Sequence, residues 1–162
     1  MKSIFSLLSV LSIISILLFG CDEDELGGFN VKIILVDEFG KQTSLFEDGD
    51  SLIFKFYFSN NTGSDATYSN PCGGVWQYFK IYKEDSKGVY KYYSQPNYAC
   101  AAIGMCLIIK DGERILLAAI PWSTEFGWPE RKPGKYYVGD TLTLHINSES
   151  YDFIERIYFE IL

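Results

Sequence analysis

The chain has 162 residues, of which 48% are hydrophobic and 17% aromatic, and its 21 acidic and 14 basic residues give a net charge of −7. This length fits one domain behind a short leader, and an acidic chain without a basic run argues against binding to nucleic acid. Aromatic enrichment favours strands, and no stretch beyond residue 21 repeats apolar residues at helical spacing, so the sequence predicts an all-β protein.

Residues 1–20 are typical of a secretory signal peptide. Lys2 supplies a positive start, and the uncharged apolar run over 4–19 is shorter than the ~20 residues that a membrane-spanning helix needs. The run ends in Leu18-Phe19-Gly20-Cys21, which resembles the lipobox of bacterial lipoproteins, although Phe19 stands where a small residue is commoner. The resemblance implies that Cys21 is acylated, for example with palmitate; an uncleaved anchor is the alternative.

Residues 21–28 form the predicted tether. The four acidic residues 22–25 directly follow the cysteine, and Gly27 and Gly28 precede the domain. Like charges next to glycine favour a solvated spacer. Such a run resembles the export signal that some diderm bacteria use for the outer face of the outer membrane, and a spacer without a sorting role is the alternative. The expected location is therefore the outer membrane, with the protein lipid-anchored at the cell surface or on the periplasmic face.

Residues 29–162 carry the signals of a β-rich domain. Phe29 to Val36 is apolar almost throughout, which predicts a strand covered on both faces or placed near the centre of a sheet. Residues 51–59 alternate strictly between inward and outward positions. The inward side chains of this strand are expected to be Leu52, Phe54, Phe56 and Phe58.

Short strands and turn signals fill the rest of the domain. Residues 86–88 and Asp111-Gly112 predict hairpins, and the apolar C-terminus predicts a last strand pinned inside a sheet. Eight to ten short strands separated by such turns favour a β-sandwich, with a small barrel as the alternative. The further strands are expected over 66–69, 75–83, 89–94, 106–110, 114–120, 135–138, 140–147 and 153–162.

Four segments between residues 49 and 146 carry a resemblance to a known family. They are GDSLIFKFYFSNNTGSD, VWQYFKIYKEDSKG, IIKDGERILLAAIPW and KPGKYYVGDTLTL. Their order is similar to that in the immunoglobulin-like domain of the intracellular proteinase inhibitor family, although Asp111-Gly112-Glu113 replaces the usual Pro-Gly-Glu. The resemblance implies an immunoglobulin-like antiparallel sandwich. It does not carry protease inhibition over, because a fold alone does not specify a function.

Cysteines beyond the lipidation site suggest one disulfide. Cys72, Cys100 and Cys106 allow one bridge and one leftover thiol in an exported chain. All three pairings stay open, and a bridge that involves Cys72 is favoured. A metal site is not expected, because His145 is the only histidine and no Cys-x-x-Cys spacing exists.

The sequence contains little that supports a catalytic role. Glu47, Asp48 and Asp50 could form a carboxylate pair or bind calcium, but their spacing is also that of an ordinary turn, which is the favoured interpretation. A cysteine nucleophile needs a histidine base, and the alternation of its strand places His145 on the outer face. No phosphate loop, nucleophile elbow or dinucleotide motif occurs, so we expect neither an enzyme nor a cofactor.

The loop from Pro121 to Pro129 is the most suggestive stretch for binding. Trp122, Phe126 and Trp128 are bracketed there by prolines and a glycine, as in a stiff aromatic platform for a sugar or a protein. The other interpretation, which is favoured, is that Trp122 ends its strand in the core and the other two rings cap one end of the sandwich. The sequence thus predicts a lipid-anchored binding or accessory module with a glycan or protein ligand; a protease inhibitor and a structural envelope component are the alternatives.

Overall fold

The computed structural model describes residues 27–70, 79–94, 105–123 and 128–162. This part of the chain is all β, and no helix occurs in it. The strands in chain order are β1 (Phe29–Val36), β2 (Leu45–Phe46), β3 (Ile53–Asn60), β4 (Ala66–Asn70), β5 (Ile81–Glu84), β6 (Tyr90–Ser94), β7 (Met105–Ile109), β8 (Arg114–Pro121), β9 (Gly134–Ile146) and β10 (Glu149–Ile161).

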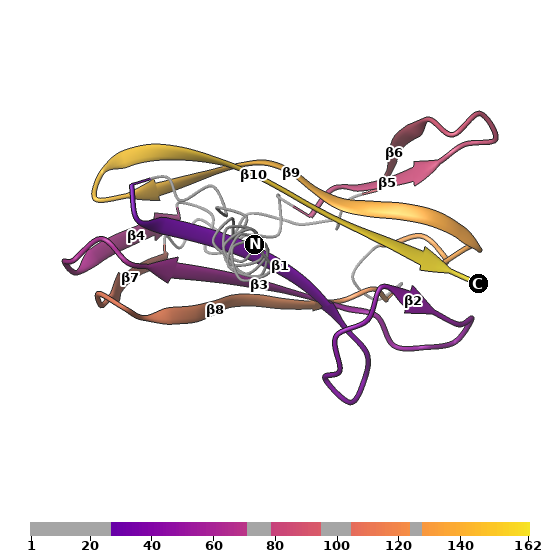
Figure 1. The fold of residues 1–162 in the computed structure, drawn as a ribbon, viewed down its shortest axis with the longest axis horizontal. Helices are drawn as coiled ribbons and strands as arrows, with labels where there is room; N and C mark the ends of the chain where they lie inside the picture. The colour runs from indigo at the N-terminus through magenta and orange to yellow at the C-terminus, as the bar shows by residue number, and fades with distance from the viewer. Residues whose placement is uncertain (1–26, 71–78, 95–104, 124–127) are drawn as a thin grey trace, which may run out of the picture.

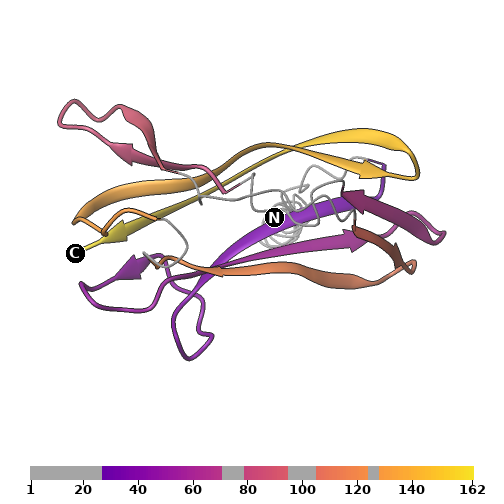
Figure 2. The same cartoon turned by 180° about the vertical axis from the view of Figure 1, so that it is seen from behind.

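The strands form two open sheets that face one another, the arrangement of a β-sandwich. One sheet has the order β1-β3-β8, and the other has the order β2-β10-β9-β4-β7 with the β5–β6 hairpin attached to β9. Figure 1 shows the long β9–β10 pair above β3 and β8, and the β5–β6 hairpin extends past the end of the sandwich. The same two layers are seen from behind in Figure 2. The predicted all-β class is therefore confirmed.

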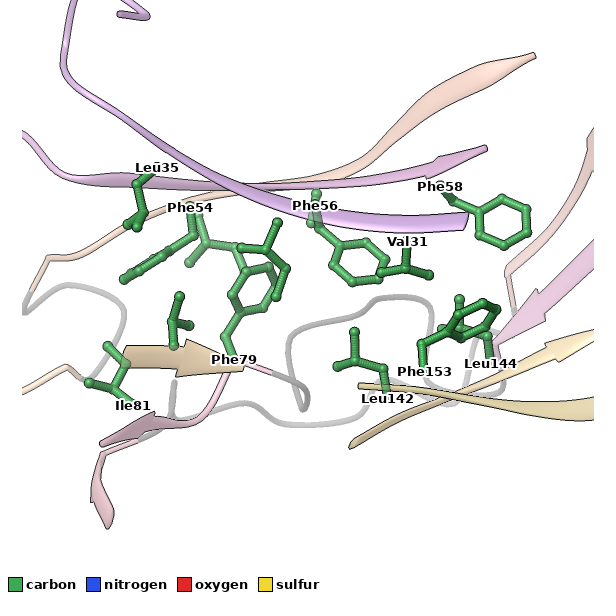
Figure 3. Close-up of a cluster of buried hydrophobic side chains, with 14 of the residues drawn as sticks. Val31, Leu35, Phe54, Phe56, Phe58, Phe79, Ile81, Leu142, Leu144 and Phe153 are labelled. Carbon is green, nitrogen blue, oxygen red and sulfur yellow. The ribbon is translucent and has the colours of Figure 1, made fainter. Parts of the chain in front are cut away.

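Strict alternation of side chains builds the core between the two sheets. Phe54, Phe56 and Phe58 of β3 are completely buried, as the sequence predicted, and they point toward the side chains of β9 and β10 (Figure 3). Opposite them lie Leu142, Leu144 and Phe153. Every described member of this core lies between Phe29 and Ile161, so a chain that begins after residue 21 retains it complete.

The placement of β1 differs from the expectation. The strand has its predicted bounds, but it pairs with β3 on one side only and forms an edge of its sheet as far as the described residues go. Part of this edge is covered by other groups. The Ile33 N–H donates to Glu155 Oε1 at 3.4 Å, and the Leu35 carbonyl accepts from Thr43 N–H at 3.2 Å. An apolar edge strand covered in this way is less available for pairing with another chain.

The turn at Asp111-Gly112 does not close the predicted hairpin. β7 pairs with β4 in one sheet and β8 pairs with β3 in the other, so the turn crosses between the layers. Asn60, buried at the end of β3, holds this crossing: its side-chain amide donates to the Ile109 carbonyl at 2.9 Å, and its own carbonyl accepts from Gly112 N–H at 2.7 Å. A local Asp-Gly signal fixes the turn but not which strands pair beyond it.

Other connections follow the sequence more closely. β5 and β6 pair around the turn at 86–88, and β9 pairs with β10 along its whole length. The C-terminus is pinned as predicted, because β10 pairs with β2 in parallel and Leu162 N–H donates to the Phe46 carbonyl at 2.9 Å. The two strands expected over 135–147 are one continuous strand that passes through Gly139 at a φ of 115°.

Candidate functional site

The tryptophans of the predicted aromatic loop lie in the core. Trp122 is 5% exposed and Trp128 is 2% exposed, and their ring centroids are 6.2 and 5.5 Å from that of Phe54. The Trp122 indole N–H donates to the Pro129 carbonyl at 2.9 Å, which fixes the ring in place. Phe126 lies outside the described residues. The expectation of an exposed platform is therefore wrong for the two tryptophans, because each ring completes the packing around a phenylalanine.

The candidate cysteines do not form a site in the described part of the chain. Cys106 is exposed and free, on the outer face of β7 opposite Ser69, so neither predicted pairing that includes it is formed. Cys21, Cys72 and Cys100 lie outside the described residues. The predicted lipidation of Cys21 and the predicted bridge between Cys72 and Cys100 therefore stay predictions.

The polar candidates behave as turn and surface residues. The Glu47 N–H donates to Asp50 Oδ2 at 2.8 Å, so these two residues stabilise their own turn. His145 is half-buried on the outer face, with Nδ1 3.1 Å from Ser150 Oγ. Within the described ranges, no group of three or more His, Cys, Asp or Glu side chains could hold a metal ion.

A row of tyrosines crosses four strands on the outer face of the larger sheet. Register pairs Tyr92 of β6 with Tyr82 of β5, Tyr82 with Tyr137 of β9, and Tyr137 with Tyr158 of β10. Tyr90 joins the row, with its ring centroid 5.2 Å from that of Tyr137. We call these five residues the tyrosine face. Tyr82, Tyr137 and Tyr158 each stand next to a buried residue of the same strand, whereas Tyr90 and Tyr92 flank the exposed Lys91 of β6.

The rings of the tyrosine face are packed against one another. Tyr82 and Tyr137 are stacked, with centroids 4.5 Å apart and planes 16° apart. Tyr92 stands nearly perpendicular to Tyr82 at 82°, and Tyr158 is tilted by 53° from Tyr137. Tyr92 and Tyr158 at the two ends remain 56% and 54% exposed. The result is a corrugated aromatic surface whose side chains already hold one another in place.

Polar groups border the row along one side. Lys80 Nζ and the Tyr82 hydroxyl both donate to Asp140 Oδ2 at 3.0 Å. Partial burial of the Tyr82 ring and the hydrogen bond to Asp140 raise the pKa of Tyr82 to about 12, and the hydrogen bond from Lys80 lowers the pKa of Asp140. At neutral pH Tyr82 is therefore a neutral donor beside a charged carboxylate. The Arg156 guanidinium, itself exposed, lies 5.6 Å from the centre of the Tyr137 ring.

The β5–β6 hairpin carries three of the tyrosines, and Asp85 stabilises its turn with hydrogen bonds and an ion pair. Asp85 Oδ1 accepts from the Lys87 and Val89 N–H groups at 2.9 and 3.0 Å, and Asp85 Oδ2 pairs with Lys91 Nζ at 2.7 Å. The hydrogen bond from Lys91 lowers the pKa of Asp85 to about 2, with the two backbone donors adding to it. Tyr82, Tyr90 and Tyr92 are thus presented on a hairpin that is ordered at its tip.

Sequence reasoning missed this surface although the signal was present. Tyr137 in KYYV, Tyr90 and Tyr92 in YKYYS and Tyr158 in RIYFE alternate with inward positions, which Tyr136 and Tyr93 occupy in the first two segments. The tyrosines were weighed only as evidence for strands, whereas register between strands decides which outward side chains meet. That register depends on long-range pairing, which one strand's sequence does not show.

Comparison with known proteins gives no assignment. No family model matches the chain, and no curated protein matches it. Among solved structures, the chain is similar to alkylpurine DNA glycosylase AlkC of Pseudomonas fluorescens and to a β-glucosidase of Listeria innocua, each with a TM-score of 0.37 and 14% identity over 82% of this chain. It spans 30% and 16% of those chains. A structural-genomics target, SoR45, has a TM-score of 0.36 and 11% identity, with 82% of this chain and 85% of that chain covered. Similarities at this level assign neither a family nor an activity.

In the part of the chain that the structure describes, no helix is long and apolar enough to cross a membrane.

Proposed function

We propose that this protein is a non-catalytic, lipid-anchored binding module of the cell envelope, and that its ligand contacts the tyrosine face. The anchor is Cys21, at the end of the lipobox-like tetrad. The acylated chain holds the domain at the outer membrane, and the domain presents the binding surface. The observation that carries the binding role is the row of tyrosines that crosses β6, β5, β9 and β10.

Tyrosine is suited to a binding surface for physical reasons. Its ring buries a large apolar area on contact while its hydroxyl keeps a hydrogen bond, and it has few rotatable bonds to immobilise. On the tyrosine face the rings already pack against one another, so ordering them on binding costs less than ordering isolated side chains. Arg156 adds a planar cation of the kind that recurs with tyrosine in binding hot spots.

A protein ligand fits this geometry better than a glycan does. A sugar ring stacks on one flat aromatic face, whereas the stacked pair Tyr82 and Tyr137 turn their faces toward each other. The ends of the row are tilted, so the surface offers ring edges and hydroxyl groups at several angles. Such a corrugated, amphipathic surface is complementary to the side chains of another protein.

We further infer an immunoglobulin-like type of sandwich. Its support is the pair of largely antiparallel sheets that face each other across an alternating core, together with the sequence resemblance given above. Protease inhibition would need an exposed, rigid loop, and the two buried tryptophans weaken the case for the loop that the sequence favoured. A purely structural role would not require the tyrosines.

The size of the complex in membrane extracts tests the binding role. With mild detergent, the wild-type protein is expected to elute with its partner, well above the size of the free chain. Tyr92→Ser combined with Tyr158→Ser removes the two most exposed rings and should weaken the complex at least about 10-fold, because interface tyrosines are often hot spots. Gel filtration followed by immunodetection measures the shift to the free chain.

A matched control separates the tyrosine face from general surface change. Ile108 is 71% exposed on β7 of the same sheet, away from the tyrosine row, so Ile108→Ser should leave the complex intact. Unfolding in urea should show that all the variants fold. A complex that survives loss of both tyrosines, or that is lost equally in the control, would overturn the assignment. A complex that a glycan-degrading enzyme dissolves would make the ligand a glycan.

A further inference from the structure

The tyrosine row runs between charged side chains of opposite sign. On β10, Arg156 and Glu160 lie two positions before and after Tyr158, so the three side chains share the outer face of the strand. In register, Glu160 pairs with Lys135 of β9, and Arg156 pairs with Gly139. We call the line of residues through Glu160 the first border of the row and the line through Arg156 the second border.

The sign of the charge is inverted across the row on β5 as well. Lys80 and Glu84 stand two positions before and after Tyr82. The Lys80 carbonyl accepts from Gly139 N–H at 3.0 Å, which places Lys80 on the second border. Glu84, on the other side of Tyr82, therefore lies on the first border. On β5 as on β10, the first border is negative and the second border is positive.

β9 has the reverse order of charges. Lys135, on the first border, lies two positions before Tyr137. On the second border the charge is that of Asp140, whose Oδ2 accepts from Lys80 Nζ at 3.0 Å. From β5 through β9 to β10, the signs are therefore minus, plus, minus on the first border and plus, minus, plus on the second. The first border consists of Glu84, Lys135 and Glu160, and the second of Lys80, Asp140 and Arg156.

The tyrosine hydroxyls report the same separation of charge. Burial raises the pKa of Tyr90, and the charges of Glu84 and Glu160 raise it further, so both carboxylates lie near this hydroxyl. Burial also raises the pKa of Tyr137, whereas the charge of Arg156 lowers it. The potential over the tyrosine face therefore changes from one side of the row to the other.

We propose that a second copy of this chain binds the tyrosine face, with a two-fold axis along the tyrosine row. The inference rests on the proposed function in that it takes the tyrosine face to be a binding surface. Such an axis lays the row of one copy on the row of the other and brings the first border of each copy against the second border of its partner. Every charge then faces the opposite charge of the same or the neighbouring position. The facing pairs are Arg156 with Glu160, Lys80 with Glu84, and Lys135 with Asp140.

The order of the charges also selects this axis over the other one that would bring the two faces together. A two-fold axis along the strands would lay each border on itself, so Glu84 would face Glu160 and Lys135 would face its own copy. Like charges placed opposite one another suppress such an arrangement. In the proposed dimer the ion pairs fix the orientation, and the rings supply the buried area, since Tyr92 and Tyr158 are 56% and 54% exposed in the single chain.

Analytical ultracentrifugation of the unlipidated chain, combined with exchange of two charges, tests the dimer and its axis. Residues 22–162 retain the complete described core and are expected to dimerise between about 1 and about 200 µM. Arg156→Glu should raise the dissociation constant about 10-fold, because two exposed ion pairs become repulsive contacts. Glu160→Arg should raise it by a similar factor. The chain with both changes should return to within about 3-fold of wild type, since opposite charges face one another again.

Lys41→Glu is the control for the change in net charge. Lys41 is exposed in the turn after β1, outside both borders, so the dissociation constant should stay within about 2-fold of wild type. Urea unfolding should show that every variant folds. A chain that stays monomeric over the whole concentration range, or a double charge exchange that dimerises no better than the single ones, would overturn the proposal.

The proposed function can fail or stand independently of the dimer. If the purified chain is monomeric while the complex in membrane extracts still depends on Tyr92 and Tyr158, the tyrosine face binds a different protein. The second copy would then be excluded and the binding role kept. A dimer that the loss of both tyrosines leaves unchanged would overturn the second copy as the occupant of this face.

Discussion

Gly139→Ala is expected to destabilise the protein by about 2–5 kcal/mol. Gly139 has a φ of 115°, which L-residues rarely adopt, and a Cβ there would lie 2.0 Å from the Glu155 carbonyl oxygen of the neighbouring strand. The backbone conformation costs roughly 1–2 kcal/mol, and relief of the clash between two paired strands roughly 1–3 kcal/mol more. The measurement is the midpoint of unfolding in urea.

Gly49→Ala is the control for backbone strain alone. Gly49 has a φ of 96°, and nothing lies within 4 Å of a Cβ built on it. Its substitution should cost about 1–2 kcal/mol, without the contribution of the clash. Equal midpoints for the two variants would show that β9 and β10 are not as close at Gly139 as the structure places them.

Phe54→Ala should cost about 3–5 kcal/mol, the range for deletion of a large buried ring. Phe54 is completely buried, and its ring contacts those of Phe79, Trp122, Trp128 and Phe159. Removing it leaves a cavity between the two sheets and takes away the ring that the two tryptophans share. Besides the urea midpoint, tryptophan emission should move to longer wavelength as water reaches the indoles.

The same substitution at the surface supplies its control. Phe39 is 86% exposed in the turn after β1, so Phe39→Ala should change the stability by less than ~0.5 kcal/mol. If Phe54→Ala lowered the stability as little as Phe39→Ala, the Phe54 ring would not pack against both tryptophans in the core.

Much of the fold could be predicted from single strands, because one strand's alternation reports which side chains it buries. The inward phenylalanines of β3 were obtained in this way, and the bounds of β1 were obtained from its nearly continuous apolar run. What alternation does not report is which strand lies beside which. For this reason β1, expected to be covered on both faces or placed near a sheet centre, forms an edge. Asp111-Gly112 was expected to close a hairpin and instead crosses between the sheets.

The candidate site was predicted poorly for a related reason. Trp122 and Trp128 stand in a loop with proline and glycine, where exposure is the usual outcome, yet both pack on Phe54 from another strand. Conversely, Tyr82 and Tyr137 look like ordinary strand residues until register brings their rings to 4.5 Å. Burial of a loop and assembly of a surface both depend on contacts that are distant in sequence.

Photochemical cross-linking in living cells tests the binding role of the tyrosine face most directly. A photoreactive amino acid is placed at Tyr92 on the tyrosine face or, as the control, at Leu116, which is 48% exposed on β8 of the other sheet. The expected result is a discrete protein adduct from position 92 and no such adduct from position 116. The same adduct from both positions, or no protein adduct from position 92, would contradict the binding role.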